Sequence, residues 1–249
     1  MQSLPTEIFP DRDALGRHVA DLAASILRDT IAANGGARLV VATGSSQFEV
    51  LEHLVAAPGI DWRAVEGFHL DEYVGLPMTH PASFCGYLKR RFVDRVPLKS
   101  FAYLRGDLPP SDVIQDVGTR LLAAPIHLAL VGIGENGHLA FNDPPADFQS
   151  TEPYKIVQLD EACRRQQVGE GWFENLDTVP RQAISMTIRQ IMACQAILCT
   201  VPDARKSDAV ARTLGDPISP DIPASILRQH PRATLCLDAA AAAKISGKA

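Results

Sequence analysis

The sequence predicts an α/β fold with a single doubly wound, mainly parallel sheet and helices on both faces, a modified Rossmann-like arrangement. Short apolar runs of strand length alternate with amphipathic helical segments, which is the pattern of a parallel sheet covered on both sides. No internal repeat, low-complexity tract or linker interrupts the 249 residues. We therefore expect one domain over residues 1–249.

The elements follow from periodicity and from their stop signals. Apolar positions at helical spacing predict a helix over residues 12–33, which Asn34-Gly35-Gly36 ends. A second helix is expected around residues 186–192, and the alanine-rich stretch 239–243 predicts a short terminal helix. Apolar runs predict strands at 38–42, 67–70, 126–131, 156–159, 196–201 and 234–237.

Charge and composition exclude several classes of partner. There are 29 Asp and Glu against 24 Lys and Arg, and this acidic balance argues against nucleic acid or an anionic membrane surface as the main partner. No apolar run approaches the ~20 residues of a membrane span. The segment MQSLPTEIFPDRD lacks the features of a signal peptide, so we expect a cytoplasmic protein. Five cysteines without CxxC spacing predict reduced thiols and no metal site.

Polar or glycine-rich sequence follows three of the predicted strands, at Thr43–Ser46, Asp71–Tyr73 and Gly132–Asp143. The carboxyl ends of parallel strands meet at one edge of a sheet, and ligands bind there. We therefore expect these three segments to form one site.

The segment Thr43-Gly44-Ser45-Ser46 lies between a strand and a helix. Backbone N–H groups at a helix start, with hydroxyl donors beside them, can bind an anion. Serine and threonine are also ordinary helix-capping residues, so phosphate binding and capping both remain open. The segment does not match the P-loop pattern.

Gly132 to Gly137 match the GxGxxG pattern of dinucleotide-binding proteins. That fingerprint needs a helix that opens at the third glycine. Here Pro144-Pro145 would end any such helix within two turns. The sequence context therefore argues against a nucleotide cofactor.

His138 and Asp71 are the candidates for proton transfer. His138 follows the glycine loop and has Asn136 and Asp143 close by in the sequence, and a histidine oriented by such groups suits proton transfer near neutral pH. Asp71 and Glu72 end an apolar strand, where desolvation makes a carboxylate a stronger base; a structural pair that caps the next turn is the alternative. There is no GxSxG elbow for a serine hydrolase. A Cys-His nucleophile pair stays open but has no support, because no cysteine lies at a strand end with polar neighbours.

Around these residues the sequence resembles the glucosamine-6-phosphate deaminase family. The matching segments are ATGSS (42–46), FHLDEYVGL (68–76), HPAS (80–83) and GIGENGHLAFNDP (132–144). The resemblance continues through VPRQAISM (179–186), PDARK (202–206) and QHPRATLCLD (229–238), and so covers nearly the whole chain. The sister branch, the 6-phosphogluconolactonases, shares the fold and the glycine–histidine loop, but typically lacks the AFN-acid-Pro continuation.

The resemblance implies that glucosamine 6-phosphate is converted to fructose 6-phosphate and ammonia without a cofactor. Asp71 would shuttle a proton between C2 and C1, and His138, supported by Asn136 and Asp143, would open the pyranose ring. The residues implied to bind the substrate or its phosphate are Thr43, Gly44, Ser45, Ser46, Glu72, Gly137 and Lys206. A 6-phosphogluconolactonase or another sugar-phosphate isomerase is the alternative, and a sugar-phosphate sensor without turnover is a second.

The chain departs from the family pattern in three places. Many members carry Asp in place of Asn136 and Glu in place of Asp143, which leaves the geometry of the proton relay open. Many also have an arginine just before the pair matching Trp172-Phe173, where this chain reads Gln-Gln-Val-Gly-Glu-Gly-Trp-Phe. This third departure leaves open whether the substrate's anion is a phosphate.

The resemblance also bears on regulation and assembly. Allosteric members bind N-acetylglucosamine 6-phosphate through basic side chains after the AFN motif, but residues 146–155 here hold one lysine and two acids. We therefore expect no activation by that effector. The expected partner is a small sugar phosphate, and the oligomeric state, a homo-oligomer included, stays open.

Overall fold

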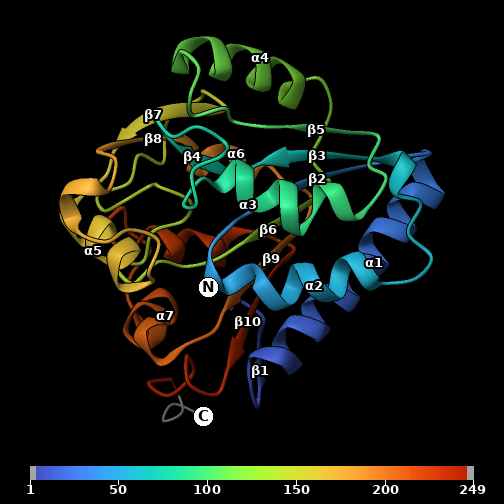
Figure 1. Ribbon diagram of the computed structural model, residues 1–249. Coiled ribbons are helices and arrows are strands. Elements are labelled where there is room, and N and C mark those ends of the chain that lie inside the picture. Colours follow the sequence, from blue (N-terminus) through green and yellow to red (C-terminus); the bar gives the residue numbers. More distant parts are fainter. Residues whose placement is uncertain (1–3, 246–249) are drawn as a thin grey trace.

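A seven-stranded parallel sheet forms the centre of the computed structural model, which describes residues 4–245 (Figure 1). Its spatial order is β1 (Thr6–Phe9), β10 (Ala233–Asp238), β9 (Ile197–Val201), β6 (Leu128–Val131), β2 (Ala37–Val41), β3 (Val65–His69) and β5 (Ser100–Ala102). The chain builds outward from β2 through β3 to β5 and then returns to place β6 on the other side of β2. The doubly wound, mainly parallel α/β fold is thus confirmed. Of the predicted span 1–249, residues 1–3 and 246–249 lie outside the described part.

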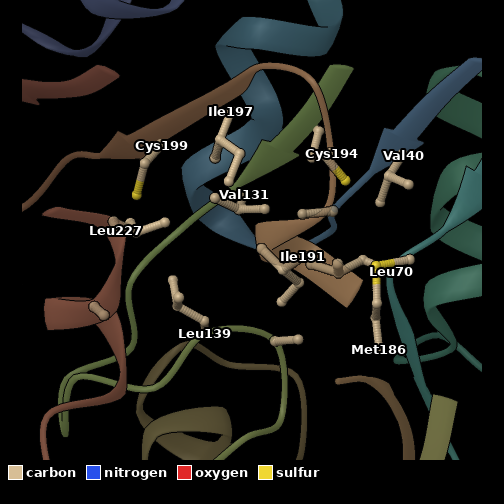
Figure 2. Packing of buried hydrophobic residues seen from close by; sticks show 14 of the residues in the cluster. Val40, Leu70, Val131, Leu139, Met186, Ile191, Cys194, Ile197, Cys199 and Leu227 are labelled. Atoms are coloured by element: carbon tan, nitrogen blue, oxygen red, sulfur yellow. The ribbon is translucent and has the colours of Figure 1, made fainter. Parts of the chain in front are cut away.

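Two hydrophobic cores cover the two faces of this sheet. Alternate strand residues point to opposite faces, so Leu39 and Val41 enter one core while Val40 enters the other. The first core receives α1 (Arg12–Asn34), α2 (Phe48–Ala56) and α3 (Phe84–Arg91). The second receives α4 (Pro110–Leu122), α6 (Ile188–Met192) and α7 (Ser207–Gly215), and Figure 2 shows part of it around Val131 and Ile197.

The remaining helical segments are short. They are α5 (Glu161–Gly169) and the 3₁₀ turns η1 (Ser45–Gln47), η2 (Trp62–Ala64), η3 (Val93–Arg95), η4 (Leu176–Thr178), η5 (Ala204–Lys206) and η6 (Pro223–Gln229). In the described part of the chain, no helix is both long and apolar enough to cross a bilayer.

The long helix α1 begins and ends where the sequence places it. The Asp11 side chain accepts a hydrogen bond from the backbone N–H of Ala14, which caps the first turn. Gly35 ends the helix in the left-handed conformation, with φ 72°, and its N–H donates to the carbonyl of Ile31.

A second, antiparallel sheet corrects the expectation of a single sheet. It consists of β4 (Asp71–Tyr73), β8 (Gln182–Met186) and β7 (Tyr154–Gln158). The predicted strand at 156–159 is therefore real but belongs to this small sheet. The chain changes sheets at Leu70, whose N–H donates to Val41 in the parallel sheet and whose carbonyl accepts from Met186 beside β4.

The predicted terminal helix at 239–243 is wrong. These residues form turns after β10, and the Asp238 side chain accepts a hydrogen bond from the N–H of Ala241. Alanine has a high helix propensity, but a segment this short cannot form a stable helix from propensity alone.

Candidate active site

Four neighbouring strands of the parallel sheet, β9, β6, β2 and β3, end at one cleft. Segments that follow all four strands line it, and α5 with the residue after it closes one side. Its empty volume is about 630 Å³, open mouth included. The cleft lies where β2 and β6 diverge in chain order, which is the switch point at which open α/β sheets bind ligands.

The loop Thr43–Ser46 carries the chain from β2 into η1 and lines the cleft. Gly44 adopts a φ of 96°, which an L side chain would strain. The hydroxyl of Thr43 is buried and has no hydrogen-bond partner among the described residues. An unpaired buried hydroxyl costs free energy, so this loop offers a donor to a ligand in addition to its backbone N–H groups.

Asp71, the first residue of β4, lines the cleft as a buried carboxyl, with 6% of its surface exposed. Burial raises the pKa of Asp71 to about 8, and the neighbouring charge of Glu72 adds to the shift. A carboxyl with a pKa near neutrality can both take up and release a proton at working pH.

Glu72 does not line the cleft, although it was expected among the substrate-binding residues. Its carboxylate accepts hydrogen bonds from the Ser83 hydroxyl (2.9 Å) and from the backbone N–H groups of Tyr73, Phe84 and Cys85 (2.8, 3.1 and 2.7 Å). Burial still raises the pKa of Glu72, because these four bonds offset only part of the desolvation. Glu72 therefore caps the start of α3, which matches the structural alternative.

His138 is oriented by the two residues expected to support it. Its Nδ1 lies 2.9 Å from Oδ1 of Asp143, and its backbone N–H donates to the Asn136 side chain (3.1 Å). The Asn136 amide in turn donates to Asp143 (3.1 Å). Since an ionised carboxylate can only accept, Nδ1 carries the proton and Nε2 is left to exchange protons with a ligand.

Asp143 is held as an anion. Its burial alone would raise its pKa, but the hydrogen bond and the charge of His138, with the Asn136 amide, outweigh this and lower the pKa of Asp143. Asp71 and Asp143 therefore have pKa values shifted in opposite directions, so Asp71 can exchange a proton near neutral pH while Asp143 stays ionised beside His138.

The glycine loop leaves room for the histidine. A Cβ on Gly134 would lie 2.2 Å from Nε2 of His138, so only glycine fits this close approach. Gly137 has a φ of 88° and turns the loop without lining the cleft. Residues 138–143 form turns and an isolated bridge between Leu139 and Asn142. The helix that a dinucleotide fingerprint requires is therefore missing from this described loop, as the sequence predicts.

Lys206 reaches the cleft from the loop after β9. The residue is 5% exposed, and its Nζ lies 3.4 Å from Oε1 of Glu170. Its neighbour Arg205 does not line the cleft and pairs with Asp203 at 2.8 Å. The structure thus places Lys206, and not Arg205, where it can contact a bound ligand.

His138, Asp143 and Cys163 have donor atoms within 4.8 Å of one another, close enough to be considered as metal ligands. A cysteine binds metal as the thiolate. Burial and the charges of Asp143 and Asp160 raise the pKa of the Cys163 thiol well above its usual range. In the structure Nδ1 of His138 and Oδ1 of Asp143 contact each other directly at 2.9 Å, and we assign this pair to a hydrogen-bond relay.

The cleft residues outside the three predicted segments include Phe84, Gln166, Gln167 and Glu170. Phe84 and Phe141 stack with ring centroids 5.8 Å apart and give the cleft an apolar wall. The three polar residues come from α5 or directly follow it. The altered sequence before Trp172 is the signal that could have pointed to them.

The fold and this cleft define the class of protein: an α/β enzyme whose acid–base groups lie at the switch point of a parallel sheet. Residues 10–236 match the family model described as glucosamine-6-phosphate isomerases/6-phosphogluconolactonase. A glucosamine-6-phosphate deaminase of Streptococcus suis is 35% identical over 230 residues, which cover 91% of this chain and 94% of the relative.

Solved structures agree on the fold. A structure described as a monomeric glucosamine-6-phosphate deaminase matches with a TM-score of 0.87 and 26% identity, over 97% of this chain and all of the other. A 6-phosphogluconolactonase from Trypanosoma brucei matches with a TM-score of 0.79 and 16% identity, over 98% of this chain and all of the other. The chain belongs to the glucosamine-6-phosphate isomerase/6-phosphogluconolactonase family, and it is an enzyme.

Proposed function

We propose that this enzyme isomerises and deaminates glucosamine 6-phosphate, giving fructose 6-phosphate and ammonia. The observation that carries the proposal is the pairing in one cleft of a buried carboxyl, Asp71, whose pKa is raised to about 8, with the His138–Asp143 pair. The 35% identity to a relative named as a deaminase supports the same branch of the family.

The proposed reaction needs two proton-transfer sites. His138 takes the proton of the C1 hydroxyl at Nε2 and delivers it to the ring oxygen as the C1–O5 bond breaks and the C1 aldehyde forms, with Asn136 and Asp143 holding its orientation. Asp71 takes the C2 proton of the open-chain aldehyde, which gives a cis-enolamine, and returns it to C1. Water then adds to the resulting C2 imine, and ammonia leaves with formation of the ketone. The C1 carbonyl acidifies the C2 proton, so the residues of the cleft suffice for this sequence.

The remaining cleft residues are assigned to binding. Thr43, Gly44, Ser45 and Ser46 supply hydroxyl and backbone donors at the start of η1, and Lys206 supplies the nearby positive charge. Such donors suit a phosphate. We further propose that the chain acts as one domain over residues 1–249, in the cytoplasm, on a small sugar phosphate.

The test is product analysis with purified enzyme. Glucosamine 6-phosphate should yield equal amounts of ammonia and fructose 6-phosphate, and in D₂O some of the fructose 6-phosphate should carry deuterium at C1. Hydrolysis of 6-phosphogluconolactone without ammonia release from the amino sugar would instead establish the lactonase alternative.

Variants assign the two proton-transfer roles. His138→Gln should slow turnover of the cyclic substrate more than that of an open-chain analogue, because only the former needs ring opening. Equal losses on both substrates would remove His138 from ring opening.

A further inference from the structure

The carboxylate of Glu170 lies inside the cleft, where it has four polar neighbours. Its Oε1 is 2.8 Å from the Gln166 amide and 3.4 Å from Lys206 Nζ. Its Oε2 accepts from the Ser45 hydroxyl (3.4 Å) and from the Trp172 indole N–H (3.3 Å). The Glu170 side chain is only 6% exposed. The Glu170 carboxylate is therefore a buried, hydrogen-bonded group and not a solvated surface charge.

Two of those neighbours, Ser45 and Lys206, are the side chains assigned above to the substrate's phosphate. Two further cations lie nearby, and both face carboxylates of their own. Arg205 has Asp203 at 2.8 Å and Glu135 at 3.8 Å. Arg12, which donates to the carbonyl of Ser45, pairs with Glu49 at 3.1 Å. A phosphate that enters the cleft therefore meets a negative charge beside its donors. Two like charges a few ångströms apart in a buried site repel each other strongly.

We propose that Glu170 is an internal competitor for the phosphate subsite: its carboxylate holds Ser45 and Lys206 in the free protein, and a phosphate monoester must displace it to bind. The inference rests on the proposed function, which identifies these donors as the phosphate subsite. A carboxylate offers the same kind of oxygen acceptor as a phosphate but carries less charge. The more highly charged ligand can therefore replace the side chain, at a cost in affinity.

The backbone around Glu170 permits this displacement. Glu170 is the C-terminal cap of α5 and stands between Gly169 and Gly171. Gly171 has a φ of 80°, and a Cβ at either glycine would meet nothing within 4 Å. Glycine gives the backbone on both sides of Glu170 more conformational freedom. The Glu170 side chain can therefore leave the cleft while the sheet stays in place.

The experiment compares the binding of inorganic phosphate to wild type, Glu170→Gln and Glu135→Gln by calorimetry. Glutamine has no charge and keeps one acceptor oxygen, which can accept from the Gln166 amide or from the Trp172 indole N–H but not from both. We expect Glu170→Gln to bind phosphate about tenfold more tightly, the size of one charge-assisted contact. Glu135→Gln removes a carboxylate 4.0 Å from Lys206 Nζ that does not line the cleft, and it should change the affinity by less than about twofold.

Kinetics give a second measurement. The KM for glucosamine 6-phosphate should fall in Glu170→Gln by about the same factor, with kcat little changed, because the lost competition affects binding of substrate and transition state alike. If Glu170→Gln does not fold, Glu170→Asp withdraws the carboxylate by one methylene group and should tighten phosphate binding to a smaller extent.

The outcomes separate this inference from the proposed function. Unchanged phosphate affinity in Glu170→Gln, or equal tightening by Glu135→Gln, overturns the inference even if the wild type releases ammonia. Tighter phosphate binding without ammonia release from glucosamine 6-phosphate supports the inference and rejects the proposed reaction. Turnover of an unphosphorylated amino sugar, with no phosphate binding by any variant, rejects both.

Discussion

Two adjacent acidic residues, Asp71 and Glu72, have different roles because successive strand residues point to opposite sides. Asp71 faces the cleft, and Glu72 faces the start of α3. Burial raises the pKa of both carboxyls. The four hydrogen bonds to Glu72 offset part of its loss of water, and Asp71 is therefore the carboxyl that we propose for proton transfer.

Replacing Asp71 should lower activity and increase stability. Asp71→Asn should reduce kcat by ~10²–10⁴-fold, the usual loss for a general base. Because the folded-state pKa lies above the unfolded one, ionised Asp71 destabilises the fold, and this penalty grows as the pH rises from about 4 to about 8. The variant should therefore gain on the order of a few kcal/mol of unfolding free energy near pH 8, measured by urea denaturation.

Asp143→Asn is the matched control for that stability measurement. The pKa of Asp143 is lowered, so its ionised form stabilises the fold above the unfolded pKa and loses this effect in acid. This variant should lose stability at neutral pH. A loss of stability in Asp71→Asn as well, or more than a tenth of wild-type kcat, would contradict the role given to Asp71.

Glu72→Gln should act on stability. An amide cannot accept all four hydrogen bonds, and its NH₂ group would face backbone donors, so we expect a loss of about 2–4 kcal/mol. Urea denaturation checks the loss, and the KM of the folded fraction should stay within about twofold, because Glu72 does not line the cleft. A large rise in KM without loss of stability would restore Glu72 to the substrate-binding residues.

At the scale of elements, the loop after β6 determines where the histidine sits. The His138 ring packs against the backbone of Gly134, in the same loop. The backbone N–H of Gly134 donates to the carbonyl of His138 at 3.0 Å. Asp143 contacts Nδ1 of the His138 ring, and the Asn136 amide donates to Asp143. Small changes in this loop should therefore move the His138 ring without unfolding the sheet.

Gly134→Ala tests this packing. The added methyl group would lie 2.2 Å from His138 Nε2, so the ring must shift, and a displacement near 1 Å can cost ~10²-fold in rate. Gly215→Ala at the end of α7 is the control, since a Cβ there meets nothing within 4 Å. Steady-state kcat/KM of both variants gives the comparison, and equal values would mean that the loop absorbs the methyl group freely.

At the scale of the whole molecule, the segment after the AFN motif bears on regulation. Asp147 and Lys155 line a second pocket, with Lys155 Nζ 3.9 Å from the Asp147 carboxylate. The segment 146–155 contains no other basic residue. An effector phosphate needs several converging donors, and here the one lysine already faces an acid.

We therefore expect hyperbolic kinetics that N-acetylglucosamine 6-phosphate does not alter. A ligand shifts a two-state equilibrium only if it binds the two states with different affinities. With a single basic residue, the segment 146–155 has few donors that could create such a difference for an effector phosphate. Initial rates against glucosamine 6-phosphate, with and without the effector, are the measurement, and the oligomeric state should be determined on the same sample. A sigmoidal curve that the effector makes hyperbolic would contradict the expectation.

The sequence by itself determined the parallel α/β class, the limits of α1, and the strand ends where Thr43, Asp71 and His138 lie. These follow from local periodicity, helix caps and the rule that parallel strands end at one edge. Only the tertiary structure decided that β4, β7 and β8 form a separate antiparallel sheet, that Glu72 caps α3, and that Glu170 occupies the cleft. Each of these depends on partners far apart in the chain, because a carboxylate takes its role from the donors that surround it, and those donors come together only on folding.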